Sequence, residues 1–232
     1  MHEIIRLPQL KIFSSAPTPL KKFLLVVGGR PPTVEFLKKI SSTVDHIIAV
    51  DRGIDACLQS DVIPELLIGD LDSARSDSID WARSKNIPID RHPVDKDFTD
   101  LQLALHKIKS IERSAAIVTG AFGGRLDHLY ANLFTCAHST VRTVLADQSE
   151  IIFFVRPDAP LTLEFISRPF ALSLLPITEV CRGVSIDGVH WSLDRADLFQ
   201  SFPNAISNRV ENDRVNISID DGILAIALSF DR

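Results

Sequence analysis

The sequence is poor in cysteine and contains no long apolar run. Its three cysteines, Cys57, Cys136 and Cys181, are far apart and form no C-x-x-C pair, which is typical of buried apolar cysteines in a reducing compartment. No segment approaches the ~18 consecutive apolar residues of a membrane-spanning helix, and the first residues do not follow the pattern of a signal peptide. We therefore expect a cytoplasmic protein that does not insert into a membrane.

The sequence also lacks an excess of positive charge. Its formal net charge is -5, and the short basic pairs at 21–22 and 38–39 are typical of the solvated flanks of a strand and a helix. A protein that binds nucleic acid normally carries a basic stripe, so we expect no nucleic-acid partner. Hydrophobic residues make up 45% of the 232 residues and charged residues 24%, which indicates a globular protein large enough to bury a sizeable core.

From residue 22 to about 146, apolar runs alternate with amphipathic segments. Strands are expected at 23–27, 46–50, 66–68 and 115–119, and helices at 33–40, 53–60, 79–84 and 101–108. This alternation predicts an α/β domain at 1–148 with a mostly parallel, Rossmann-like sheet. In such sheets, ligands bind beyond the carboxyl ends of the strands.

After residue 149 the pattern changes to short β-like runs with little helical periodicity. The runs lie at 151–155, 161–165, 171–175, 183–186, 215–219 and 223–228, and turn residues separate them. We therefore expect a smaller antiparallel β-sandwich domain at 149–232. The Asp-Gly pair at 221–222 is expected to form a hairpin turn between the last two runs. No pattern can be assigned to 194–205, and residues 1–20 could form an edge strand and a surface arm.

Acidic residues cluster on three short loops of the first domain. The clusters are GDLDS at 69–73, DKDFTD at 95–100 and GGRLDH at 123–128, and Asp51 ends a further strand. Carboxylates that converge in one cleft repel one another by about 4 kcal/mol per pair at 4 Å and an effective dielectric of 20. Such a cleft needs a cation, and oxygen ligands suit a hard ion such as Mg²⁺ bridging to substrate phosphates.

Asp70 and Asp72 are the strongest candidates for metal ligands. In an extended strand end, both carboxylates point to the same side while Leu71 faces the core. Helix capping by Asp72 or Ser73 is the structural alternative. Asp97 and Asp100 lie at the start of an expected helix, where capping would explain them if they stood alone. Next to Asp70 and Asp72, a shared metal site is the better interpretation.

The glycines at 123–124 allow close approach of the backbone to a ligand, and the helix that follows offers free N–H groups to an anion. Arg125 can bind phosphate oxygens, or it can pair with a nearby acid. His128 is as compatible with capping or packing as with catalysis. In the second domain, Trp191 next to polar groups could bind a flat heterocycle, preferably a cationic one, although packing on a half-buried sheet is its more common role.

Together these motifs resemble the active-site signature of the thiamine pyrophosphokinase family. The resemblance rests on VDRG at 50–53, GDLDS at 69–73, KDFTD at 96–100 and GGRLDH at 123–128, and on the later G-x-x-W-x-L at 188–193 and Ser-Asn at 207–208. Six motifs in order, over roughly residues 22 to 230, make the match specific. It implies a homodimeric enzyme that transfers the diphosphate of ATP to the hydroxyl of thiamine, giving thiamine diphosphate and AMP.

The resemblance also implies roles for individual residues. Asp70, Asp72 and Asp100 would hold Mg²⁺, with Asp97 close by, while Lys96 and Arg125 would neutralise the charge that develops on the phosphates. Either Asp70 or Asp97 would orient or deprotonate the hydroxyl of thiamine. The residues expected to bind ATP are Asp51, Gly53, Thr99, Gly123, Gly124, Asp127 and His128. Trp191, Ser207 and Asn208 would bind thiamine, in a site shared between two subunits.

Two alternatives belong to other classes. Asp70-Leu71-Asp72-Ser73 after an apolar strand also resembles the start of haloacid-dehalogenase-type phosphatases, but that mechanism needs a later lysine and an acidic pair at further strand ends. The available pair, Asp220 and Asp221, lies in the expected hairpin. A non-catalytic sensor of thiamine or nucleotide would not need so many metal-binding acids.

Overall fold

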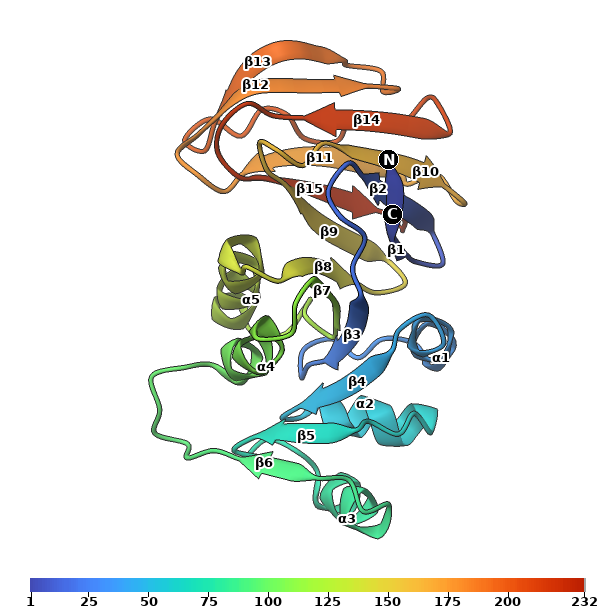
Figure 1. Cartoon of the computed structure of the whole chain (residues 1–232), viewed down its shortest axis with the longest axis vertical. Helices are drawn as coiled ribbons and strands as arrows, with labels where there is room; N and C mark the ends of the chain where they lie inside the picture. The colour runs from blue at the N-terminus through green and yellow to red at the C-terminus, as the bar shows by residue number, and fades with distance from the viewer. Residues whose placement is uncertain (232) are drawn as a thin grey trace. The chain divides into compact units, whose positions relative to one another are not determined.

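The computed structural model describes residues 1–231 and contains two compact units (Figure 1). One unit is the continuous segment Pro19–Gln148, called here the α/β unit. The other combines Met1–Thr18 with Ser149–Arg232 and is called the β unit. Within the described residues, no helix combines the length and the apolar character that crossing a membrane requires.

The α/β unit contains six strands in the order β8-β7-β3-β4-β5-β6. Every neighbouring pair among them is parallel, which confirms the expected parallel sheet. The central strands are buried as predicted, since Leu24, Leu25 and Val26 have no exposed surface. The strands are β3 (Lys21–Val26), β4 (His46–Val50), β5 (Leu66–Gly69), β6 (Ile89–Arg91), β7 (Ser114–Thr119) and β8 (Arg142–Ala146).

Five helices connect these strands, with α1, α2 and α3 on one face of the sheet and α4 and α5 on the other (Figure 1). Thr33 caps the first helix by accepting a hydrogen bond from the N–H of Phe36, and Thr99 forms a capping box with Gln102 at the fourth. The expected helices are confirmed. Their bounds are α1 (Val34–Ser41), α2 (Gly53–Ser60), α3 (Ser76–Ser84), α4 (Asp100–Lys109) and α5 (Leu126–His138).

The β unit contains two antiparallel sets of strands. Six strands follow the order β1-β2-β10-β14-β12-β13, and β15 pairs with both β11 and β9. Leu161, Leu163, Val215, Ile217 and Ile186 alternate with more exposed positions and form part of its core. The strands are β1 (His2–Arg6), β2 (Leu10–Ser14), β9 (Glu150–Val155), β10 (Leu161–Phe165), β11 (Ala171–Pro176), β12 (Val180–Asp187), β13 (Leu193–Phe199), β14 (Arg214–Ser218) and β15 (Leu224–Ser229).

The structure corrects two expectations about organisation. Residues 1–18 do not belong with the α/β segment, as the expected domain 1–148 implied, because β2 pairs with β10 and so joins the β unit. The turn at Asp221-Gly222 does not close a hairpin, because β14 pairs with β10 and β12 whereas β15 pairs with β9 and β11. The unassigned stretch 194–205 begins with most of β13, which pairs with β12.

Candidate functional site

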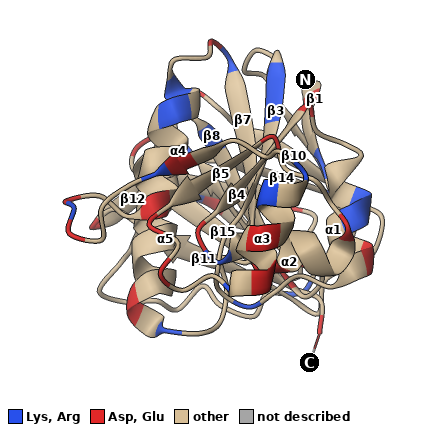
Figure 2. Cartoon of the chain, turned by 90° about the horizontal axis from the view of Figure 1, so that it is seen from below, with Lys and Arg blue, Asp and Glu red and all other residues tan. Residues whose placement is uncertain are grey.

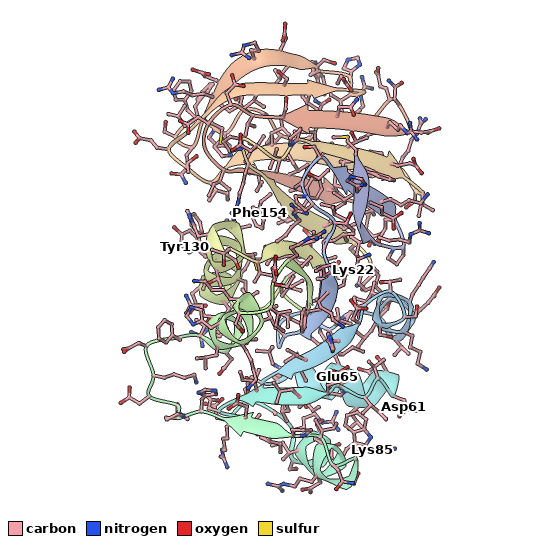
Figure 3. All side chains as sticks on the ribbon, in the orientation of Figure 1. Lys22, Asp61, Glu65, Lys85, Tyr130 and Phe154 are labelled. Carbon is pink, nitrogen blue, oxygen red and sulfur yellow. The ribbon has the colours of Figure 1, made fainter. Side chains whose placement is uncertain are left out.

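Three carboxylates converge at the carboxyl ends of β4 and β5. Asp51 directly follows β4, Asp70 directly follows β5, and Asp100 is the first residue of α4. One carboxylate oxygen of each lies within 4.8 Å of the others. The side chains labelled Lys22 and Glu65 in Figure 3 lie at the other edge of the sheet, where β3 and β5 begin. The cluster therefore lies at the carboxyl ends of the strands, where parallel sheets bind ligands.

The backbone around this cluster is strained. Asp51 has φ 48° and Leu71 has φ 65°, a left-handed region that residues with a side chain seldom adopt. Each such residue costs about 1–3 kcal/mol, and strain of this kind is concentrated at functional sites. Gly69 permits the close approach of the two strand ends, because a Cβ atom there would lie only 3.1 Å from Cα and Cβ of Asp51.

Lys96 neutralises part of the negative charge. Its ammonium group lies 2.7 Å from Asp70 and 3.3 Å from Asp100. Burial alone would raise the pKa of Asp70, but hydrogen bonds from Lys96 and from the Asp72 N–H outweigh it and hold that pKa below its ordinary value. Burial raises the pKa of Asp100, and the nearby lysine only partly opposes this. The pKa of Lys96 is raised, because its two carboxylate partners outweigh its burial.

The donor set fits a hard cation. The Asp51 Oδ1 atom is buried and has no hydrogen-bond partner among the described residues, whereas its Oδ2 accepts a hydrogen bond of 2.5 Å from the Ser73 hydroxyl. The Asp70 side chain is only 11% exposed. An unpartnered carboxylate oxygen beside two further carboxylates is an arrangement that an oxygen-preferring ion such as Mg²⁺ satisfies.

Asp72 and Asp97 lie outside the three-carboxylate cluster. Asp72 is exposed, and its N–H donates to Asp70 Oδ1 at 3.2 Å. The expectation of an extended backbone here is wrong, because Leu71 turns in the left-handed region while its side chain stays buried. Repulsion from Asp70 and hydrogen bonding with it raise the pKa of Asp72. Asp97 is exposed, and the assignments of Asp72 to the metal and of Asp97 to the hydroxyl remain predictions.

The glycine loop after β7 leads into α5. Gly123 and Gly124 are exposed and have φ of 66° and 70°, which only glycine adopts readily. Arg125 pairs with Asp127 at 2.5 Å, which confirms the alternative that Arg125 forms an ion pair with a nearby acid. The hydrogen bond from Arg125 lowers the pKa of Asp127. Both side chains and His128 are exposed. The free N–H groups at the start of α5 lie next to them.

Two further residues predicted to bind ATP have structural roles in the α/β unit. Gly53 is buried, and a Cβ atom at this position would lie 1.7 Å from the carbonyl oxygen of Val26. The residue therefore allows α2 to begin directly against the end of β3. Thr99 is the N-cap of α4 and thereby places Asp100 on the first turn.

The residues predicted to bind thiamine form a local cluster in the β unit. Trp191 is 58% exposed, which excludes packing on a half-buried sheet, and the Arg209 guanidinium lies 5.6 Å from the centre of its ring. Asn208 is buried. Its Oδ1 accepts hydrogen bonds from the N–H groups of Trp191 and Arg209, and its Nδ2 donates to the Trp191 carbonyl. Ser207 is exposed and its N–H donates to Ser173.

A pocket of about 400 Å³ lies elsewhere in the β unit. Its lining includes Thr162, Asp187 and Asn216 but none of the predicted site residues. The carboxylate cluster is the better candidate for a metal and phosphate site, because such sites are formed by converging charged groups rather than by enclosed volume. Figure 2 shows acidic segments on α3 and α4 and basic segments on α1 and β3.

Sequence reasoning missed two features of these sites. Ser73 binds Asp51, although it was considered only as a helix cap. Asp51, expected in the nucleotide site, joins the carboxylate cluster that was predicted to contain Asp72. The position of Asp51 after a strand was a signal for this role, but only the parallel pairing of β4 with β5 shows that Asp51 and Asp70 lie side by side.

Comparison with known proteins gives one consistent family. The model described as thiamin pyrophosphokinase, catalytic domain, matches residues 37–145, and the vitamin B1 binding domain of thiamin pyrophosphokinase matches 165–224. The chain is 25% identical over 216 residues to a thiamine pyrophosphokinase of Bacillus subtilis (strain 168). The aligned region covers 91% of this chain and 100% of that protein. It is 24% identical over 238 residues to thiamine pyrophosphokinase 2 of Oryza sativa subsp. japonica, covering 92% and 89% of the two chains.

Solved structures show the same fold. The thiamine pyrophosphokinase from Bacillus subtilis superposes with a TM-score of 0.78 at 23% identity, over 91% of this chain and 100% of the other. The yeast enzyme superposes with a TM-score of 0.72 at 16% identity, over 92% and 88%.

Proposed function

Because this chain belongs to the thiamin pyrophosphokinase family, we propose that it transfers the diphosphate group of ATP to the hydroxyl of thiamine. The thiamine oxygen forms a bond to the β-phosphorus, the bond from that phosphorus to the oxygen bridging to the α-phosphate breaks, and the hydroxyl proton passes to a carboxylate of the site or to water. The products are thiamine diphosphate and AMP. The observation that carries this proposal is the convergence of Asp51, Asp70 and Asp100 at the ligand-binding edge of a parallel sheet.

We infer that Asp51, Asp70 and Asp100 hold Mg²⁺, with Asp72 as a further candidate. A bound Mg²⁺ would neutralise phosphate charge and orient the transferred group. Lys96 lies between Asp70 and Asp100 and can donate hydrogen bonds to phosphate oxygens. Asp70 belongs to the carboxylate cluster, whereas Asp97 is exposed and lies outside it. We therefore assign the orientation of the thiamine hydroxyl to Asp97.

The nucleotide is proposed to bind along the same edge of the sheet. The exposed glycines Gly123 and Gly124 and the start of α5 offer N–H groups to phosphate, and Arg125 can exchange Asp127 for phosphate oxygens. His128 lies next to Asp127 at the start of α5, while Gly53 and Thr99 position α2 and α4. These features support a Rossmann-like nucleotide-binding unit.

Thiamine is proposed to bind at Trp191, with Ser207 nearby and Asn208 holding the tryptophan in place. The thiazolium ring of thiamine is cationic and gains about 0.5–2 kcal/mol over an indole face. Arg209 already lies over the Trp191 ring, and the His190 ring meets it edge-on with the ring centres 4.6 Å apart. Thiamine must therefore displace one of these groups or use the part of the indole that they leave open. Following the family resemblance, we infer a homodimer in which the Trp191 segment of one β-sandwich completes the site of the other protomer, in the cytoplasm.

The first test is incubation of the purified protein with thiamine, ATP and Mg²⁺, followed by chromatography of the products. We expect AMP and thiamine diphosphate in equal amounts, and neither product after chelation of the metal. Formation of ADP and thiamine monophosphate would instead establish transfer of a single phosphoryl group. Absence of any metal-dependent product would refute the proposal.

A second test identifies the third metal ligand. Asp51→Asn and Asp72→Asn are compared for Mn²⁺ affinity by electron paramagnetic resonance, with the exposed Asp80→Asn as a control. We expect Asp51→Asn to weaken binding by at least about tenfold. A larger loss in Asp72→Asn would assign Asp72 to the metal in place of Asp51.

Neither alternative function is supported. The phosphatase mechanism requires an acidic pair at the strand ends of the same site, but Asp220 and Asp221 belong to the β unit, where Asp220 pairs with Arg195. A sensor does not require the three converging carboxylates.

A further inference from the structure

We propose that Arg30 is a positioning residue, which holds the glycine loop at 120–124 in shape through its ion pair with the buried Asp147. This inference rests on the proposed function, because the loop leads to Arg125 and Asp127 at the start of α5. Arg30 follows the strand β3, the glycine loop follows β7, and Asp147 follows β8, so the three segments leave adjacent strands at the same edge of the sheet.

The ion pair is anchored in the interior. The Asp147 side chain has no exposed surface, whereas that of Arg30 is 38% exposed. Both Nε and Nη2 of Arg30 donate to Asp147 Oδ2, at 3.0 and 2.6 Å. Pairing with a cation stabilises a carboxylate at such a depth, because burial removes the solvent that would otherwise compensate its charge. Asp147 therefore fixes where the Arg30 side chain lies.

The Arg30 segment in turn fixes the glycine loop. The Gly29 N–H donates to Gly120 at 2.7 Å, and the Arg30 N–H donates to Phe122 at 2.6 Å. The guanidinium also lies 5.9 Å from the centre of the Phe122 ring. A Cβ atom on Gly123 would lie 2.9 Å from Cβ of Arg30, so the two segments are as close as a glycine allows. Arg30 thus contacts the loop through its backbone, its stem and its charged group.

Arginine is needed for this combination. Its planar guanidinium donates two hydrogen bonds to one carboxylate while it presents a flat face to an aromatic ring, which an ammonium group cannot do. The loop residues Gly123 and Gly124 are exposed and have left-handed backbones, so the contacts with Arg30 act on the part of the loop that has the greatest conformational freedom. We expect the Arg30–Asp147 ion pair, called here the clamp, to keep the N–H groups before α5 aligned for binding phosphate.

The test compares Arg30→Met, Arg30→Lys and the double variant Arg30→Met with Asp147→Asn. The double variant removes the ion pair without leaving the Asp147 charge buried. It can therefore be used for the same measurements if Arg30→Met alone does not fold. We expect KM for ATP to rise about tenfold in the methionine variants, with kcat and KM for thiamine changed less than threefold, and partial recovery in Arg30→Lys. The control Arg83→Met breaks the exposed pair with Asp80 and should leave all three constants unchanged.

Hydrogen exchange provides a readout that does not depend on turnover. We expect faster exchange of the amides in 120–126 in the double variant, with unchanged exchange in β4 and β5. Unchanged exchange in this loop, or equal losses for ATP and thiamine, would overturn the positioning role. If the wild-type protein makes no thiamine diphosphate, the proposed function fails while the exchange experiment still decides whether Arg30 holds the loop.

Discussion

Three carboxylates in the α/β unit lie closer together than their charges favour. At an effective dielectric of 20, a pair 4 Å apart repels by about 4 kcal/mol, which a single neighbouring ammonium offsets only in part. Lys96 contacts Asp70 and Asp100, while Asp51 Oδ1 finds no hydrogen-bond donor among the described residues. The site is therefore arranged for a second cation.

Replacement of Asp70 by asparagine should separate activity from stability. We expect kcat to fall at least about a hundredfold, because the cation and the phosphates lose a central charge. The melting temperature should fall only slightly, because the loss of the ion pair with Lys96 is partly offset by the loss of repulsion from the neighbouring carboxylates. Steady-state kinetics and calorimetry on the same preparation test this. Wild-type turnover in Asp70→Asn would contradict the assignment of Asp70 to the site.

Replacement of Asn208 by alanine should reduce the stability of the protein as well as its affinity for thiamine. The variant loses three partly buried hydrogen bonds to backbone groups of Trp191 and Arg209, which costs about 1–3 kcal/mol in the free energy of unfolding. We expect KM for thiamine to rise while KM for ATP is unchanged. Urea denaturation and kinetics measure both effects. Ser207→Ala is the neighbouring control, which should retain the stability of the wild type.

Among the elements, α4 links the edge strand β6 to the carboxylate cluster. Its first residue is Asp100, and Lys107 in its last turn pairs with Asp90 of β6 at 2.5 Å. The hydrogen bond from Lys107 is the main reason that the pKa of Asp90 lies below its ordinary value. The ion pair therefore contributes stability above the pH at which free aspartate titrates, and this contribution disappears as the pH falls through the lowered pKa.

Lys107→Met should reveal this contribution through its pH dependence. At pH 7 the variant is expected to be about 0.2–1 kcal/mol less stable than the wild type, the usual range for an exposed pair. The difference should vanish under acidic conditions in which Asp90 is protonated in both proteins. Urea midpoints over a pH series measure it, with Lys109→Met as the control. A difference that does not depend on pH would show that Lys107 acts through packing alone.

At the scale of the whole molecule, the two ends of the chain build one unit. Strand β2 lies between β1 and β10, and Leu10 and Ile12 are buried with Ile4 and Ile5 of β1. Burial of each such side chain is worth about 1.5–3 kcal/mol, and the sum is comparable to the typical net stability of a domain, about 5–15 kcal/mol. The first 18 residues are thus part of the core of the β unit rather than a surface arm.

Deletion of residues 1–18 should unfold the β unit or make it aggregate, because the edge of β10 becomes free to pair with other chains. We expect a lower melting temperature and a lower yield of monodisperse protein by size-exclusion chromatography. A synthetic peptide of residues 1–18, added during refolding, should restore part of the lost stability. A truncated protein with the melting curve of the full chain would contradict this role.

The sequence alone was sufficient for features that depend on neighbouring residues. The helices α1 and α2 and the buried strand β3 follow from local periodicity, and the spacing of the acidic clusters indicated a metal site. Contacts between distant residues were decided only by the tertiary structure. The pairing of β2 with β10, the convergence of Asp51 with Asp70 and Asp100, and the ion pair of Arg30 with Asp147 all join segments whose separation along the chain carries no periodic pattern. Such contacts depend on which strands become neighbours, and that order is set by the packing of the complete core.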